Sequence, residues 1–187
     1  MSLTRSQQLV SVQEYLEGEK DSPIRHEYVD GYVYAMAGLS DRHNRISLNV
    51  ASRLSQHLVD DPCEVFTSDM KLKVAASVYY YPDVTVCCDS PPPDPYFRSQ
   101  PVLIVEVMSA STERIDHHEK LVAYKRLDSL GEYVLISQDQ VRIEVHRRLR
   151  GEWQQETIND PTTSLVLNWV GLNITLADVY RNVRFTE

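Results

Sequence analysis

The chain has 187 residues, of which 42% are hydrophobic, and a formal net charge of −8 at pH 7. This length can bury a core without disulfide or metal cross-links, so we expect one domain over residues 1–187, with its core at about residues 11–183. The negative charge argues against a large nucleic-acid footprint, because phosphates are contacted by Lys and Arg, but it leaves room for a local basic cleft or a bound cation.

Cysteine usage and the N-terminal residues bear on the compartment. Cys63, Cys87 and Cys88 make an odd number, and none has the spacing of zinc ligands. The adjacent pair would point to opposite faces of a strand, so we expect reduced thiols. The first residues contain no apolar signal core, and no segment is long enough to cross a bilayer, which favours a soluble, cytoplasmic protein.

The first part of the chain predicts a helix and a hairpin. Ser11 and Glu14 have the spacing of a capping box, which predicts a short helix reaching Gly18. Asp30-Gly31 is the two-residue signal of a hairpin turn. The strands that this turn would join are His26–Val29, which contains Glu27, and Tyr32–Met36.

Apolar residues at every fourth position predict an amphipathic helix from Asp41 to about Leu58, capped by Ser40 or Asp41. Short strands fit Cys63–Thr67 and Met70–Val74. The next strand-like run, Tyr79–Val86, is interrupted by Pro82-Asp83. Because Pro lacks the amide donor of a central strand, this break marks the start of a strand, an edge or a bulge.

The second half predicts a helix and then a meander. Residues 113–128 have a helical apolar stripe formed by Leu121, Tyr124 and Leu127. Three strand-like segments and a closing helix from Thr175 follow, and the segments are Glu132–Ser137, Val141–Arg147 and Trp153–Ile158. This order predicts an α/β fold with a mixed β-sheet flanked by helices.

The most informative residue is Glu106, in the apolar run Val102–Met108. A strand this apolar is usually buried on both faces, and an unpaired buried carboxylate costs several kcal/mol. A cation or a proton should therefore compensate Glu106. Two or three carboxylates suit Mg²⁺ or Mn²⁺, which can activate a water for phosphodiester hydrolysis, and a nearby lysine would stabilise the developing charge.

Several motifs, in this order and separation, resemble the Uma-type restriction endonuclease family of the PD-(D/E)xK nuclease superfamily. The resemblance extends from about Ser11 to Val183. The motifs are Pro82-Asp83, Val105-Glu106-Val107-Met108-Ser109, Ser111-Thr112, Asp116-x-x-Glu119-Lys120-x-x-x-Tyr124 and Glu132-Tyr133.

The resemblance implies a restriction-endonuclease-like core with a set of metal ligands. These would be Asp83 and Glu106, the backbone carbonyl of Val107, and Glu27 as an additional acid. The superfamily lysine usually lies two residues after the glutamate, where this chain has Met108. In the family the lysine has moved to the next helix, which points to Lys120.

Two positions depart from the family pattern. Ala110 stands where the family commonly has Pro, and His117-His118 stands where an Arg is usual before the Glu-Lys pair. Adjacent histidines on a helix point about 100° apart, so this pair lacks the spacing of helical metal ligands.

Each candidate residue also has a structural interpretation. Glu106 would pair with Lys120 or an arginine without any metal, and Asp83 would be a turn acid or cap. Lys120 has the spacing for a helical ion pair with Asp116, and Glu27 for an ordinary cross-strand pair. His43 is interpreted as a polar residue of a first helical turn, with a place in the lining of the cleft as the alternative. The tyrosine run 79–81 is interpreted as packing rather than a base-stacking platform.

The function predicted from these residues is Mg²⁺- or Mn²⁺-dependent hydrolysis of DNA, with Asp83, Glu106, Lys120 and Glu27 at the site. One alternative is a catalytically silent nuclease fold used for nucleic-acid or protein binding, and another is a hydrolase of small phosphorylated substrates. The edge strands are compatible with a homodimer. A basic rim around the cleft would favour nucleic acid, and its candidates are Arg42, Arg45, Lys71, Lys73 and Arg114.

Overall fold

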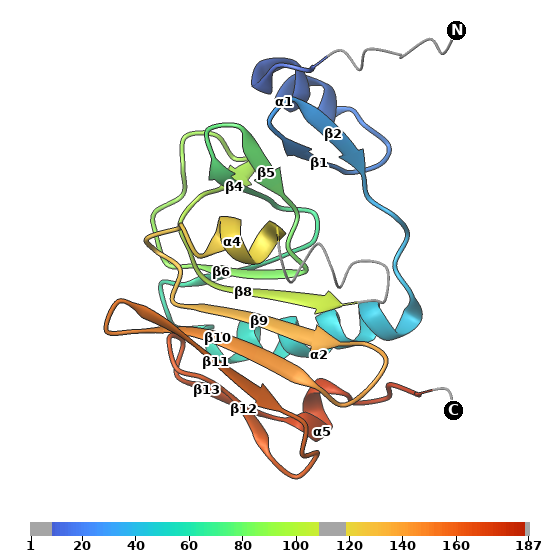
Figure 1. The fold of residues 1–187 in the computed structure, drawn as a ribbon, viewed down its shortest axis with the longest axis vertical. Helices are drawn as coiled ribbons and strands as arrows, with labels where there is room; N and C mark the ends of the chain where they lie inside the picture. The colour runs from blue at the N-terminus through green and yellow to red at the C-terminus, as the bar shows by residue number, and fades with distance from the viewer. Residues whose placement is uncertain (1–8, 109–118, 186–187) are drawn as a thin grey trace, which may run out of the picture.

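The computed structural model describes residues 9–108 and 119–185. A five-stranded sheet with helix α1 lies at one end of the molecule, a six-stranded sheet in the middle, and the β12–β13 hairpin with α5 at the other end (Figure 1). The helices in these ranges are α1 (Val12–Lys20), α2 (Asp41–His57), α4 (Leu121–Tyr124) and α5 (Leu176–Val179).

The five-stranded sheet has the order β2-β1-β5-β4-β7. Its neighbouring strands are antiparallel except for β4 and β7, which run parallel. Its strands are β1 (His26–Val29), β2 (Tyr32–Ala35), β4 (Lys71–Ala75), β5 (Val78–Tyr80) and β7 (Phe97–Arg98).

The six-stranded sheet has the order β11-β10-β9-β8-β6-β3. Its β8 and β9 are parallel and its other neighbours are antiparallel, which confirms the expected mixed sheet. Its strands are β3 (Glu64–Thr67), β6 (Val84–Cys87), β8 (Pro101–Met108), β9 (Glu132–Ser137), β10 (Ile143–Leu149) and β11 (Glu152–Ile158). A separate hairpin pairs β12 (Ser164–Leu167) with β13 (Leu172–Thr175).

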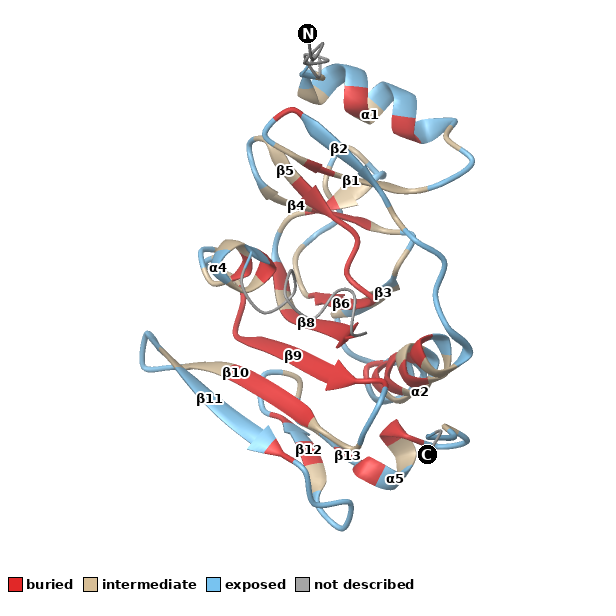
Figure 2. Cartoon of the chain, turned by 45° about the vertical axis from the view of Figure 1, so that its right-hand side comes forward, coloured by how far each residue is buried: buried red, intermediate tan, exposed pale blue. Residues whose placement is uncertain are grey.

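The six-stranded sheet is buried on both faces at its centre, where β8 and β9 are coloured as buried (Figure 2). Alternate side chains of β8 contribute to two different hydrophobic clusters. Val105 and Val107 pack with α2 and the β12–β13 hairpin, whereas Ile104 and Met108 pack with α4 and the five-stranded sheet. Glu106 has the parity of the second set, so its side chain faces the α4 side.

The local signals in the first part of the chain are confirmed. Ser11 and Glu14 form the capping box of α1, and the Ser40 side chain caps α2. The hairpin turns at Asp30 and Gly31, whose φ angles of 48° and 94° belong to the left-handed region that a two-residue turn requires. The interruption at Pro82-Asp83 separates β5 from β6.

The helix expected over residues 113–128 is shorter at its C-terminal end. The structure ends α4 at Tyr124, with Lys125 as its C-cap. Arg148 of β10 donates hydrogen bonds to the carbonyls of Lys125, Leu127 and Asp128, at 3.0, 2.9 and 2.9 Å. The helix ends because the N–H groups of Arg126 and Leu127 donate to carbonyls three residues earlier, those of Ala123 and Tyr124. Arg148 then satisfies carbonyls that follow the end of the helix. Residues 113–118, with His117-His118, lie outside the described residues, as do Ala110 and Arg114.

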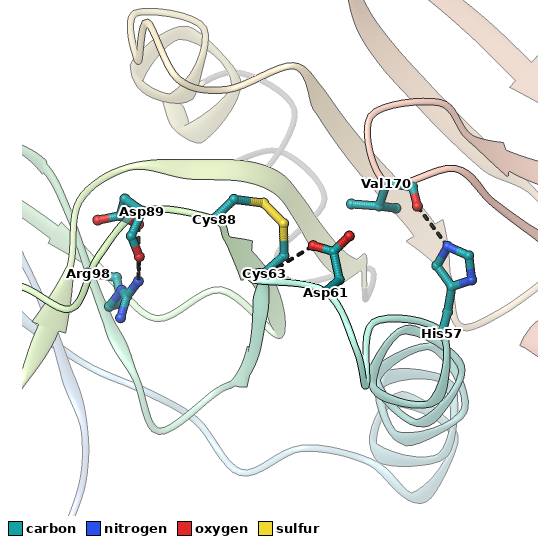
Figure 3. The surroundings of a disulfide bond; sticks show 7 residues. All are labelled: His57, Asp61, Cys63, Cys88, Asp89, Arg98 and Val170. Atoms are coloured by element: carbon teal, nitrogen blue, oxygen red, sulfur yellow. Dashed lines mark hydrogen bonds and ion pairs between the residues drawn. A yellow bond between two sulfur atoms is a disulfide. The ribbon is translucent and has the colours of Figure 1, made fainter.

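The expectation of three reduced thiols is wrong for two of them. Cys63 and Cys88 form a disulfide, and Cys87 is the buried free thiol of the described chain (Figure 3). Strands β3 and β6 are antiparallel with Glu64 opposite Cys87, so the residues just outside this pair, Cys63 and Cys88, face each other. Among the helices of residues 9–108 and 119–185, none combines the length and the hydrophobicity that crossing a bilayer requires.

Candidate active site

Glu106 is compensated from the α4 side of the sheet, as its burial in the apolar strand requires. Only 4% of its surface is exposed, and the Lys120 ammonium lies 3.1 Å from Glu106 Oε1. The Tyr124 hydroxyl donates to the same oxygen, also at 3.1 Å. Burial, followed by the charge of Glu106, raises the pKa of Tyr124 well above its ordinary value, so this hydroxyl stays a proton donor.

Lys120 joins Glu106 to a second acid from the other sheet. Its ammonium is 2.9 Å from Glu27 Oε1, on strand β1, and 5.4 Å from the centre of the Tyr80 ring. The backbone N–H of Tyr81 donates to Glu27 at 3.4 Å. Residues 27, 106 and 120 therefore converge from β1, β8 and the segment before α4, which is the juxtaposition that the resemblance implied.

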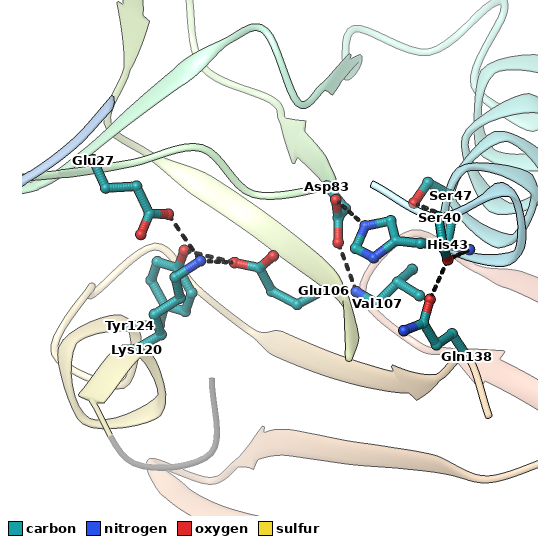
Figure 4. A network of polar contacts seen from close by, with 10 residues as sticks. All are labelled: Glu27, Ser40, His43, Ser47, Asp83, Glu106, Val107, Lys120, Tyr124 and Gln138. Carbon is teal, nitrogen blue, oxygen red and sulfur yellow. Dashed lines mark hydrogen bonds and ion pairs between the residues drawn. The ribbon is translucent and has the colours of Figure 1, made fainter. Parts of the chain in front are cut away.

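Asp83 belongs to a neighbouring group at the N-terminal end of α2. His43 Nε2 lies 2.7 Å from Asp83 Oδ1, and the backbone N–H of Val107 donates to Asp83 Oδ2 at 2.7 Å. Both His43 and Asp83 are buried, with 6% and 5% of their surfaces exposed. Figure 4 shows the two groups on either side of β8, with Glu106 directed toward Lys120 and Asp83 directed toward His43.

His43 is the site residue that the sequence interpretation missed. The sequence favoured an ordinary polar residue of a first helical turn over a residue that lines the cleft. His43 does lie in the first turn of α2, and its ring contacts Asp83. The helix start that orients it is itself fixed, because Ser40 caps the His43 N–H and donates its hydroxyl to Gln138 Oε1 at 2.5 Å. A pairing across forty residues of sequence leaves no local pattern that would have revealed it.

In this arrangement the side chains of the predicted metal ligands contact other protein groups. The carboxylates of Asp83, Glu106 and Glu27 fit a hard divalent cation in donor chemistry. Among residues 9–108 and 119–185, however, no group of three or more His, Cys, Asp or Glu side chains is assembled to hold a metal ion. To bind a cation, Glu27 and Glu106 would thus have to release Lys120, and Asp83 would have to release His43. The Val107 N–H donates to Asp83, and the role of the Val107 carbonyl as a metal ligand stays a prediction.

The four described candidates for a basic rim all contact other protein groups. Arg42 pairs with Asp139 at 3.0 Å and Arg45 with Asp41 at 3.1 Å, so both charges already have acidic partners. Lys71 and Lys73 instead lie over aromatic rings. A cavity of about 440 Å³ is lined by Asp41, Arg45, Asn182 and Arg184. None of the catalytic candidates lines it, that is, neither Asp83, Glu106, Lys120 nor Glu27.

Comparison with known proteins gives consistent matches. Residues 12–177 match the Uma2 family model, described as "Putative restriction endonuclease". Two Synechocystis sp. proteins are similar: "Uncharacterized protein slr1290", 35% identical over 94% of both chains, and "Uncharacterized protein sll1609", 32% identical over 80% of this chain and 86% of that one.

A solved structure shares the fold. It is described as a "putative nuclease belonging to DUF820" from Anabaena variabilis, and it superposes with a TM-score of 0.77 over 91% of this chain and 97% of that chain at 15% identity. This similarity establishes the mixed α/β architecture. The family match covers most of the chain, and on that ground the chain belongs to the Uma2 family.

Proposed function

We propose that the chain is a divalent-metal-dependent endonuclease that hydrolyses DNA phosphodiester bonds. The observation that carries the proposal is the convergence of Glu27, Glu106 and Lys120 from three separate elements, with Asp83 bonded to the residue that follows Glu106. The family description and the description of the Anabaena protein as a nuclease support the same reaction class.

In this proposal each side chain has a separate task. Asp83, Glu106 and Glu27 would hold Mg²⁺ or Mn²⁺, together with the Val107 carbonyl, and the ion would supply an activated water and charge stabilisation. Lys120 would stabilise negative charge on the scissile phosphate. Tyr124 keeps its proton and orients Glu106, while His43 orients Asp83.

The experiment combines cleavage with metal binding. Supercoiled plasmid is incubated with Mg²⁺ or Mn²⁺, and Mn²⁺ binding is measured by isothermal titration calorimetry on the same preparations. Glu106→Gln and Asp83→Asn preserve side-chain size and replace one carboxylate oxygen by an amide donor, and each should lower cleavage by at least about 100-fold. They should also weaken Mn²⁺ binding, which separates loss of the ion from loss of a later step.

The matched control is Glu152→Gln, which makes the same chemical change at an exposed position of β11. It should retain parent cleavage and parent Mn²⁺ binding. Cleavage that persists in Glu106→Gln would identify a contaminating nuclease and contradict the proposal.

A second candidate is a catalytically silent nuclease fold. The observation in its favour is the buried Glu106–Lys120 pair, in which the acid is already neutralised by the protein, together with the lack of an assembled metal site in the described ranges. A parent protein that neither binds Mn²⁺ nor relaxes plasmid would favour this candidate.

A further inference from the structure

Three lysines of the described chain lie over aromatic rings near α1 and the β4–β7 edge of the five-stranded sheet. The Lys20 ammonium is 5.3 Å from the centre of the Tyr96 ring. Lys71 is 5.7 Å from the Tyr81 ring and Lys73 is 5.6 Å from the Phe97 ring. These six residues form three lysine–ring pairs, and together they are called the lysine–aromatic face.

The members of the face are neighbours. Lys71 is directly opposite Phe97 in the β4–β7 pairing, and Tyr96 precedes Phe97 in the chain. Lys73 lies two residues after Lys71 on β4, so both side chains point to the same side of the sheet. Lys20 is close enough to Lys71 to act on its pKa, which connects α1 to the strands.

Lys71 lacks a protein acceptor although it is nearly enclosed. Only 5% of its surface is exposed, and within residues 9–108 and 119–185 no hydrogen bond or ion pair joins its ammonium to another group. Burial lowers its pKa, against an opposing effect from Glu19. The Nζ atom itself reaches solvent, so its donors are open to water or to an external anion.

The acids around the face are already engaged. Glu19 accepts hydrogen bonds from the His26 backbone N–H and the Tyr81 hydroxyl, at 2.8 and 2.9 Å. Asp94 accepts from the Tyr96 N–H at 2.9 Å. Accepting a hydrogen bond from a neutral donor does not remove the formal charge of a carboxylate, so Glu19 and Asp94 offset part of the charge of the three lysines. What the face offers a phosphate is the set of ammonium donors.

We propose that the lysine–aromatic face binds a single-stranded nucleic-acid segment, with phosphates at Lys20, Lys71 and Lys73 and an unpaired base stacked on Tyr96. Tyr96 is 52% exposed, so its ring is accessible to a base. A lysine ammonium has three donors, so contact with a ring leaves donors for a phosphate. The inference rests on the proposed nuclease function only in taking a nucleic acid as the polymer that binds.

The face is distinct from the candidate active site. Glu27 and Tyr28 are successive residues of β1, so they face opposite sides of the five-stranded sheet. Glu27 contacts Lys120 on one side, whereas Tyr28 packs with Tyr79 and α1 on the other. Binding at the face can therefore be measured without the cleavage reaction.

The test is fluorescence anisotropy with a labelled oligothymidylate of about 12 nucleotides, in EDTA so that no cleavage occurs. The parent should bind with an affinity that falls as salt rises. Lys20→Gln and Lys73→Gln should each weaken binding and reduce the slope of log affinity against log salt by about 0.7. Tyr96→Ala should weaken binding by at least about fivefold through lost stacking.

The matched control is Lys125→Gln, because Lys125 also lies over an aromatic ring, 5.6 Å from the centre of Trp153, and α4 places it away from the face. This variant should bind like the parent. A parent that does not bind the oligonucleotide, a control as weak as Lys73→Gln, or an unchanged Tyr96→Ala would each overturn the inference. Oligonucleotide binding by a parent that fails to cleave plasmid would support the face while contradicting the proposed endonuclease.

Discussion

At the scale of single residues, Glu106 and Lys120 depend on each other. Their side chains are 5% and 8% exposed, so water contributes little to the solvation of either charge. Burying both ions costs several kcal/mol, and their mutual attraction repays that cost only while both are present. The ion pair at the candidate site therefore also affects the stability of the folded state.

Removing the ammonium should be more costly than removing the pair. We expect Lys120→Met to lower the free energy of unfolding by about 3–5 kcal/mol, because Glu106 and Glu27 lose a shared buried cation. The double variant Glu106→Gln/Lys120→Met should recover part of this loss. Urea denaturation followed by circular dichroism measures both. A loss below about 1 kcal/mol in the single variant would show that solvent already compensates Glu106.

The candidate site could be predicted only in part from the sequence. An acid in an apolar strand requires compensation, and that physical argument together with the resemblance led to Lys120. His43 could not be found in this way, because its contact with Asp83 depends on how α2 is placed against the start of β6. The residue types were visible, but the pairing was set by tertiary structure.

At the scale of elements, strong local signals were sufficient where they existed. The capping box of α1, the Asp30-Gly31 turn and the four-residue periodicity of α2 each specify an element without distant help. The β12–β13 hairpin was missed because each strand has four residues and their connection contains no Asn-Gly or Asp-Gly pair. The end of α4 was misplaced because the chain changes to i→i−3 hydrogen bonds after Tyr124, and the carbonyls that follow bond to Arg148 of the distant strand β10.

Two glycines allow opposite predictions for the same substitution. A Cβ at Gly131 would lie 2.0 Å from Cε2 of Trp169, so Gly131→Ala must displace the indole and should cost about 1–3 kcal/mol. Gly18 is inside α1 with no heavy atom within 4 Å, so Gly18→Ala should stabilise by about 0.5–1 kcal/mol. Urea unfolding and tryptophan fluorescence measure both, and equal effects would contradict this account.

The disulfide between Cys63 and Cys88 should contribute measurably to stability. It closes a loop with a sequence separation of 25, for which the restriction of the unfolded chain is worth about 3 kcal/mol. Unfolding in the presence of a phosphine reductant should reveal a loss of this order in the parent. A Cys63→Ser/Cys88→Ser variant should already have the lower free energy of unfolding, and reductant should not change it. A change in this variant would show that the reductant acts on another group.

At the scale of the whole molecule, stability should fall at alkaline pH. Burial raises the pKa of Tyr80, Tyr180 and Cys87 to about 12 in each case. The folded state favours their protonated forms, whereas the unfolded tyrosines ionise near pH 10.0 and the unfolded thiol near 9.0. This contribution to stability is complete below those values and is lost as pH rises through about 12.

Tyr80→Phe tests one part of this effect, on the α4 side of the sheet. The variant should lose less stability than the parent between about pH 10 and 12, because one proton is no longer released on unfolding. Free energies from urea denaturation at several pH values provide the comparison. Tyr34→Phe, at a site that is 54% exposed, should leave the pH dependence of the parent unchanged. Identical profiles for the parent and Tyr80→Phe would contradict the assignment.

The parallel pairing of β8 with β9 has a consequence for how the candidate chemistry can vary. Parallel neighbours cannot be joined by a tight turn, so the backbone must travel back along the sheet between Met108 and Glu132 before β9 begins. Lys120 lies on that return path, whereas Glu106 belongs to the strand itself. Remodelling the crossover would thus reposition the cation while leaving the acid anchored, so any such change must supply Glu106 with another buried partner.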